Sequence, residues 1–330
     1  MCLICTGEYD ESLTQLNCYE CKNINSIPFL PNLQELICNE CINLVEIPIL
    51  PKLQKLDCEF VKIKEIPILP KLLSLYCSGC INIKEIPYLP KLQILWCEYT
   101  NIKEIGYLLD LRILYCSGCY GMEEIPILPI LQQLSCDYTN ISRIPYLPNL
   151  EFLRCSSLEI CEIPYLPNLS SLYCDNTNIT EIPYLPNLHV LRCSITGISK
   201  IPILPDLQEL WCDFTDIKEI PYLPNLQKLY CDYTNIKEIP DLPNLTLLHC
   251  YKSDIYNIPI IPKLQQLYCN FGEFNNNYEV NEFYCKQKLK RKLLNLYNLN
   301  KKWKDLWKIA EYYTTIKYHP NNILQYVKFD

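Results

Sequence analysis

The stretch IPYLPNLQKLYCDYTNIKE at residues 220–238 decides the fold, because close copies of it follow one another along most of the chain. Its clearest marker is a cysteine in the pattern Leu-x-Cys. Self-similarity with a fixed period of about 20 residues is typical of repeat architectures in which each unit stacks on the next. The marker recurs every 19 or 20 residues at Cys18, Cys38, Cys58, Cys77, Cys97, Cys116, Cys136, Cys155, Cys174, Cys193, Cys212, Cys231, Cys250 and Cys269.

Each repeat is predicted to form one coil of a solenoid, with a short strand before the cysteine. In residues 229–232, Leu-Tyr-Cys-Asp, successive side chains point to opposite faces of a strand, which turns Leu and Cys inward and Tyr and Asp outward. A coil of this length cannot enclose its own apolar face, so its stability must come from stacking on its neighbours. The sequence therefore predicts about 14 coils joined by one parallel sheet.

Proline dictates the path between strands. Ile-Pro prolines recur from Pro28 to Pro259, and a second series lies three residues downstream, from Pro31 to Pro262. Each proline fixes φ near about −65° and disfavours helix in the residue before it. We therefore expect an extended or polyproline-like outer face and, because thin coils lie on both sides, only modest curvature.

The pattern L-x-x-L-x-C-x-x-T-x-I, which runs from Leu226 to Ile236, resembles the leucine-rich repeat. The resemblance covers residues 13 to about 274, with Cys at the third apolar position and Thr where Asn usually stands. It implies the α/β horseshoe class, with the sheet on the concave face. The Ile-Pro-x-Leu-Pro spacer is similar to the short repeats of bacterial effector proteins, and the Cys and Asn-Ile-Lys usage is similar to leucine-rich repeat proteins of giant DNA viruses.

Composition divides the chain into a short segment 1–12, a repeat domain 13–274 and a C-terminal element 275–330. Residues 1–271 hold 19 Lys and Arg against 31 Asp and Glu, a net charge of −12. Residues 272–330 hold 11 against 6, a net charge of +5. The basic end is therefore a separate element.

Apolar residues in this element recur at helical spacing. Because a solenoid needs a polar-backed end, the pattern favours a helical cap over the last coil. The alternative is a basic amphipathic helix that contacts nucleic acid or an anionic membrane. The spaced residues are Leu289, Leu293, Leu296, Leu299, Trp303, Leu306 and Ala310.

Two turn variants follow the repeated cysteine. Six of the fourteen coils place Thr three residues after it, and the hydroxyl is predicted to bond turn backbone of its own or the next coil. The coils with a 20-residue interval place a second cysteine there instead. These pairs are Cys18 and Cys21, Cys38 and Cys41, Cys77 and Cys80, and Cys116 and Cys119.

The first two cysteine pairs follow C-x2-C-x16-C-x2-C, within the spacing of zinc ribbons. The repeat by itself produces the same spacing, and the pairs at Cys77 and Cys116 lie too far apart to share a metal. Disulfides between neighbouring coils would need closer Cβ atoms than parallel strands provide. We therefore predict buried, reduced thiols of raised pKa and no metal or other cofactor, with a zinc-binding protein as the least favoured hypothesis.

Candidate binding residues occupy the outward positions beside the cysteine. Aromatic residues precede it, carboxylates follow it, and a second aromatic series comes next. Aromatic residues are enriched at binding hot spots, and carboxylates favour a basic or proline-containing protein partner. The alternative is that Tyr tolerates a half-buried strand, that the acids aid solubility, and that duplication copied both. The candidates are Tyr76, Trp96, Glu98, Tyr99, Tyr115, Asp137, Tyr138, Tyr173, Asp175, Trp211, Asp213, Phe214, Tyr230, Asp232 and Tyr233.

Signatures of catalysis are scarce. The chain has three histidines and seven glycines, without a glycine-rich phosphate loop or a His-Glu metal motif. His249 precedes Cys250, but strand alternation turns the two side chains apart. The sequence thus favours a non-enzymatic protein–protein interaction module; the alternative is a structural or virion-associated repeat protein without a dedicated ligand. The oligomeric state stays open.

No stretch approaches the roughly 18 uncharged apolar residues needed to cross a bilayer. The start, MCLICTGEYDE, has neither a basic region nor a long apolar core. We therefore expect a cytoplasmic protein with reduced thiols. The viral resemblance extends this expectation to a host-cell cytoplasm or a virion.

Overall fold

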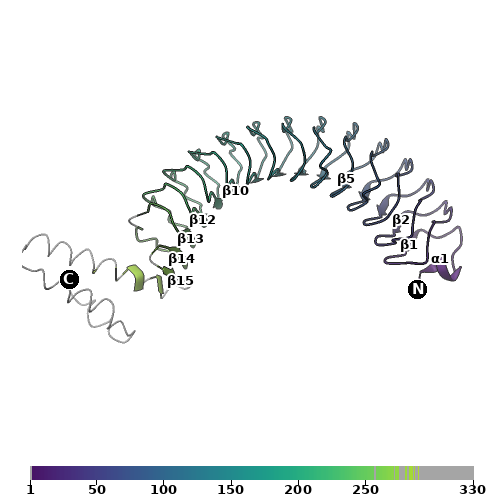
Figure 1. The fold of residues 1–330 in the computed structure, drawn as a ribbon, viewed down its shortest axis with the longest axis horizontal. Coiled ribbons are helices and arrows are strands. Elements are labelled where there is room, and N and C mark those ends of the chain that lie inside the picture. Colours follow the sequence, from purple (N-terminus) through teal and green to yellow (C-terminus); the bar gives the residue numbers. More distant parts are fainter. Residues whose placement is uncertain are drawn as a thin grey trace, which may run out of the picture.

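The described part of the chain is a curved solenoid in which all strands belong to one sheet. Within it fifteen strands follow chain order, and β1 to β14 pair in parallel, which confirms the predicted repeat solenoid. Figure 1 shows the strands along the inner edge of the arc and the connecting segments outside. The structure, a computed structural model, describes residues 2–255, 258–270, 272–274, 279–280, 282–284, 286 and 289.

Most strands are three residues long, because the turn after each cysteine and the proline spacer leave little extended chain. A four-residue helix, α1 (Leu3–Thr6), precedes them, and β15 (Gly272–Phe274) pairs antiparallel with β14. The parallel strands are β1 (Gln15–Asn17), β2 (Glu35–Ile37), β3 (Lys55–Asp57), β4 (Ser74–Tyr76), β5 (Ile94–Trp96), β6 (Ile113–Tyr115), β7 (Gln133–Ser135), β8 (Phe152–Arg154), β9 (Ser171–Tyr173), β10 (Val190–Arg192), β11 (Glu209–Trp211), β12 (Lys228–Tyr230), β13 (Leu247–Cys250) and β14 (Gln266–Cys269).

The arc in Figure 1 is more strongly curved than the thin coils led us to expect. The described segments between β1 and β14 contain no helix, so the extended outer face is confirmed. Their prolines lack the N–H that would join neighbouring coils. Asparagine side chains bridge the coils there instead; Asn225 Nδ2 donates to Pro205 O at 3.0 Å. Such side-chain bridges permit wider spacing outside than the hydrogen-bonded strands permit inside, and the stack therefore bends.

The core consists of rows of buried side chains, called ladders here, in which the same position of the repeat stacks from one coil to the next. In the coil at residues 220–238, Ile220, Leu223, Leu226, Leu229, Cys231 and Ile236 are all buried. Burying each leucine stabilises the fold by about 1.5–3 kcal/mol. Six of the described ladder thiols donate to strand carbonyls of the next coil, as Cys231 Sγ does to His249 O at 3.2 Å. Burial raises the pKa of Cys231, and the described cysteines form no disulfide.

The turn threonines form the predicted hydrogen bond, and each hydroxyl donates to a backbone carbonyl of its own coil. Thr234 Oγ1 donates to Cys231 O at 2.8 Å, and Thr215 Oγ1 to Cys212 O at 2.7 Å. These threonines are buried. Each hydroxyl therefore satisfies a turn carbonyl that water does not reach.

Replacing Thr234 with Val should lower the free energy of unfolding by about 1 kcal/mol, because the shape is kept but one buried hydrogen bond is lost. Urea titration followed by circular dichroism measures the change. The matched control is Thr246→Val, since Thr246 is half-buried and its hydrogen bond to Gln227 O is exposed to solvent. Equal effects of the two substitutions would contradict the role given to Thr234.

The thiol of the second cysteine in a pair donates to a carbonyl of the preceding coil, whereas the threonine hydroxyl donates within its own coil. Cys80 Sγ donates to Cys58 O at 2.9 Å, and Cys119 Sγ to Cys97 O at 3.1 Å. Cys97 O thus accepts from two coils, from Thr100 Oγ1 of its own coil at 2.7 Å and from Cys119 Sγ of the next coil.

The C-terminal end of the solenoid is covered by apolar side chains. Val280, Phe283 and Tyr284 are buried against the core, and Ile261 N donates to Tyr284 Oη at 3.3 Å. The described residues from 279 to 289 are helical. Most of the apolar positions used to predict the cap, from Leu293 to Ala310, lie outside the described residues. No helix of the described residues has the length and apolar character of a membrane span.

Candidate functional site

Side chains before the ladder cysteine stack along the concave face from β9 to β14. Trp211 and Tyr230 are register partners, and strands about 4.8 Å apart bring flat rings into contact. Ring centroids lie 3.7 Å apart for Trp211 and Tyr230, 4.7 Å for Tyr230 and His249, and 4.0 Å for His249 and Tyr268. The Arg192 guanidinium lies 4.4 Å from the Trp211 ring centroid. We call Arg192, Trp211, Tyr230, His249 and Tyr268 the long stack.

A shorter stack occupies β4 to β6. Trp96 lies between Tyr76 and Tyr115, with ring centroids 5.0 Å and 5.3 Å away. Within the described residues, the buried Trp96 Nε1 has no hydrogen-bond partner. Ser135 and Arg154 take the equivalent positions on β7 and β8, so the two aromatic stacks are separate surfaces.

The aspartates after the ladder cysteine accept hydrogen bonds from backbone that the sheet leaves unpaired. The N–H groups of Cys231 and Tyr233 donate to carbonyls of the next coil. The N–H of Asp232 lies between them and donates to Asp213 Oδ1 of the preceding coil at 2.8 Å. Asp137, Asp175 and Asp232 repeat this arrangement, accepting from Ser156 N, Ser194 N and Tyr251 N at 2.6, 2.8 and 2.6 Å.

These carboxylates are less exposed than a solubilising surface would require. Asp137 is only 2% exposed and pairs with Arg154, and Asp175 pairs with Arg192 at 3.3 Å. Burial raises the pKa of Asp137, Asp175, Asp213 and Asp232 despite the bonds they accept. Glu59 and Glu98 on the same face also have pKa values raised by burial. The row is thus negatively charged and poorly solvated.

Acidification from neutral pH should stabilise the protein through Asp213. Its folded pKa lies above the unfolded value, so the charged form disfavours folding, and stability rises as pH falls through the folded pKa. Asp213→Asn should keep the hydrogen bond from Asp232 N–H and remove this dependence. Urea titrations of both proteins from pH 7 downward measure it; an identical pH dependence would contradict the assignment.

The second aromatic series occupies a strained turn position at the rim of the sheet. Tyr99, Tyr138, Phe214 and Tyr233 have φ between 54° and 56°, a region that costs non-glycine residues roughly 1–2 kcal/mol. All four side chains are exposed. Phe214 and Tyr233 stack with centroids 4.3 Å apart. Most residue types at this position gave no signal of left-handed backbone; Gly79, Gly118 and Asn176 are the residues whose type indicates it.

The structure therefore arranges the fifteen candidates as two stacks, one acidic row and one rim series. Tyr173 lies next to Arg192, with the guanidinium 5.7 Å from its ring centroid. Arg192, His249 and Tyr268 complete the long stack but were absent from the candidate set. The sequence signal that could have identified them is their repeat position, which is the same as that of Trp211 and Tyr230.

An exposed apolar row on the outer face was also missed. It consists of the third residue of each Ile-Pro-x-Leu-Pro spacer or its variant, which lies ten to twelve residues after one strand and six before the next. The side chains are 52–75% exposed. The signal was the spacer itself, where this position is apolar or aromatic in nearly every coil: Phe29, Ile49, Ile68, Tyr88, Tyr107, Ile127, Tyr146, Tyr165, Tyr184, Ile203, Tyr222 and Ile260.

Several solved structures with the same coil arrangement come from bacteria. YopM from Yersinia pestis, described as a leucine-rich effector protein, is 22% identical with a TM-score of 0.65, covering 78% of this chain and 88% of that chain. The fold is a leucine-rich repeat solenoid. InlJ from Listeria monocytogenes, whose functional domain includes a cysteine ladder, is 22% identical with a TM-score of 0.64, covering 78% of this chain and 68% of that chain.

The leucine-rich repeat similarity extends to other organisms. The plant peptide hormone receptor RGFR1, solved in complex with RGF2, is 20% identical with a TM-score of 0.51, covering 75% of this chain. The chain spans 56% of that receptor chain and 62% of YopM from Yersinia enterocolitica. No protein-family model matches the sequence, and no curated protein matches it significantly.

Proposed function

We propose that this leucine-rich repeat protein binds a protein partner through its concave sheet and catalyses no reaction. The observation that carries the proposal is the long stack, a continuous aromatic and cationic surface flanked by Asp175, Asp213 and Asp232. Trp, Tyr and Arg are the residue types that dominate binding energy at interfaces. A leucine-rich repeat receptor solved with RGF2 supports the use of this fold for recognition.

The chemistry of the surface favours a partner with a basic or proline-containing segment. Burial has raised the pKa values of the neighbouring carboxylates, and a Lys or Arg placed among them would stabilise their charged form. The stacked rings offer flat apolar faces for proline or for the stem of a basic side chain. Binding should therefore weaken as pH falls through the raised carboxyl pKa values.

The shorter stack of Tyr76, Trp96 and Tyr115 is the second part of the proposed interface. Trp96 Nε1, Asp57 Oδ1 and Ser78 Oγ are buried on three successive coils without a hydrogen-bond partner among the described residues. Buried polar groups of this kind are rare in native proteins. A partner or bridging water held by Tyr76, Trp96 and Glu98 would satisfy them.

Fluorescence titration with two synthetic peptides tests the proposal on the full chain. One peptide alternates lysine and proline, and the other alternates glutamate and proline. We expect the lysine peptide alone to bind, and Trp211→Ala or Tyr230→Ala to weaken its binding at least tenfold. The matched controls Tyr184→Ala and Tyr222→Ala on the outer face should leave binding unchanged; equal binding of both peptides, or equal loss in all four variants, would contradict it.

A structural role is the second candidate, favoured by the exposed apolar row on the outer face. In this role the arc is a stiff scaffold that assembles through its outer face, without a ligand on the sheet. Quantitative comparison of proteins captured from a cell lysate separates the roles. Loss of the bound set with Tyr184→Ala and Tyr222→Ala, but not with Trp96→Ala and Trp211→Ala, supports the scaffold. We propose a cytoplasmic location for either role; the virion is part of the second candidate.

A further inference from the structure

Four cysteines meet at the amino-terminal end of the solenoid, and two of them come from the segment before the first coil. Cys2 and Cys5 are three residues apart around α1, which places both thiols on one side of a helical turn. Cys18 and Cys21 are three residues apart in the turn after β1, where Cys21 N donates to Cys18 O at 3.0 Å. Together they follow C-x2-C-x12-C-x2-C, a pairing that the repeat does not generate.

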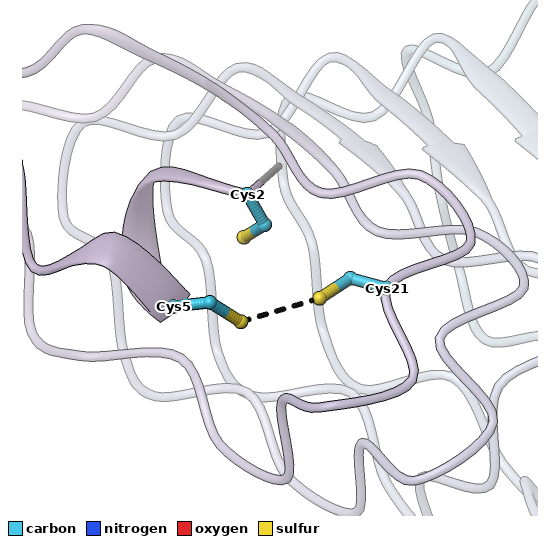
Figure 2. A group of neighbouring side chains, drawn as sticks. All are labelled: Cys2, Cys5 and Cys21. Carbon is cyan, nitrogen blue, oxygen red and sulfur yellow. Dashed lines mark hydrogen bonds between the residues drawn. The ribbon is translucent and has the colours of Figure 1, made fainter.

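The position of Cys21 differs from that of its counterparts in later coils. Cys41, Cys80 and Cys119 are fully buried and donate to a carbonyl of the preceding coil. Cys21 belongs to the first coil, and the described residues before that coil contain α1 in place of a strand. Its thiol instead faces Cys5, with the two Sγ atoms 3.4 Å apart. Figure 2 shows the thiols of Cys2, Cys5 and Cys21 directed toward one another.

Three of the sulfur positions converge. The Sγ atoms of Cys2, Cys5 and Cys21 all lie within 4.8 Å of one another; Cys18 Sγ lies outside this group but 2.7 Å from Cys2 Sγ. Thiolates bound tetrahedrally to zinc at about 2.3 Å are separated from one another by about 3.8 Å. Three sulfurs therefore already have a spacing that suits zinc, and Cys18 would supply the fourth by turning its side chain toward them.

The surroundings give a metal ion access to the cluster. The cluster borders an open surface hollow that Asn17, Lys22 and Asn23 also line, and Cys5 is exposed.

We propose that Cys2, Cys5, Cys18 and Cys21 form a structural Zn²⁺ site that fixes the amino-terminal segment over the first coil. This set differs from the one that sequence spacing suggested, Cys18, Cys21, Cys38 and Cys41. In the structure Cys41 is engaged with Cys18 O instead. The site would hold the segment that contains α1 against the turn after β1, at the end of the solenoid.

Elemental analysis of the full chain, purified under reducing conditions with zinc and then dialysed, tests the site. We expect about one zinc per chain, and near zero for Cys5→Ser and Cys21→Ser. Cys161→Ser is the matched control, because Cys161 is also exposed but lies far along the chain; it should retain the metal. Cys41→Ser should retain it too, which separates the two four-cysteine sets.

Cobalt(II) added to the metal-free protein gives a second readout. The intense visible bands of a tetrahedral thiolate complex should appear with the wild type and Cys161→Ser, and be lost in Cys5→Ser. Zinc-free protein, equal zinc in Cys5→Ser, or loss of zinc in Cys41→Ser alone would overturn the proposal. So would intact mass and alkylation showing disulfides from Cys2 to Cys18 and from Cys5 to Cys21. Far-UV circular dichroism of each variant confirms that a lost metal does not reflect a lost fold.

Discussion

Replacing Leu210 with Ala should lower the free energy of unfolding by about 2–5 kcal/mol, the range for buried leucine in a packed core. Leu210 is fully buried in β11 and is register partner of Leu191 and Leu229. The cavity therefore opens between three coils at once. Denaturant unfolding followed by circular dichroism measures the loss.

The matched control for Leu210→Ala is Leu109→Ala, because Leu109 is an exposed spacer leucine and should change stability by less than about 0.5 kcal/mol. Each coil contacts only its neighbours, so hydrogen exchange should show the largest loss of protection around β10 to β12. A uniform loss along all fourteen coils would show that the solenoid unfolds as one unit, which contradicts nearest-neighbour stacking.

Replacing Asp137 with Ala should lower the free energy of unfolding by about 1–3 kcal/mol, because the Ser156 N–H and the Arg154 side chain lose their acceptor. The hydrogen bond, more than the charge, should carry the effect, since Arg154 is about half exposed and exposed ion pairs contribute little. Urea titration at pH 7 gives the magnitude.

Asp137→Asn separates the two contributions, since the amide oxygen can still accept from Ser156 N–H. We expect it to recover most of the stability lost in Asp137→Ala. Should Asn prove as destabilising as Ala, the ion pair with Arg154 and not the backbone bond would be the dominant interaction. Either variant removes one charge from the acidic row, so the lysine peptide should bind both less tightly than wild type.

The aspartates contribute to the fold independently of any partner that they bind. A carboxylate that accepts the next coil's N–H is needed whether or not anything binds. Sequence alternation placed Asp213 and Asp232 outward, but the alternative considered for them was solubility. Their partners lie 19 residues away, and that pairing depends on stacking distances which a linear pattern does not contain.

The sequence by itself determined the coil, its period and which side chains are buried, because a 19-residue repeat leaves one way to hide Leu and Cys on every turn. It also predicted the threonine bond and the extended spacer, which follow from local chemistry at Thr234 and the prolines. Only the tertiary structure decided which coil each donor reaches, how rings on neighbouring strands stack, and that Cys2 and Cys5 meet Cys21. These contacts depend on the distances between coils, and those distances are set only when the coils stack on one another.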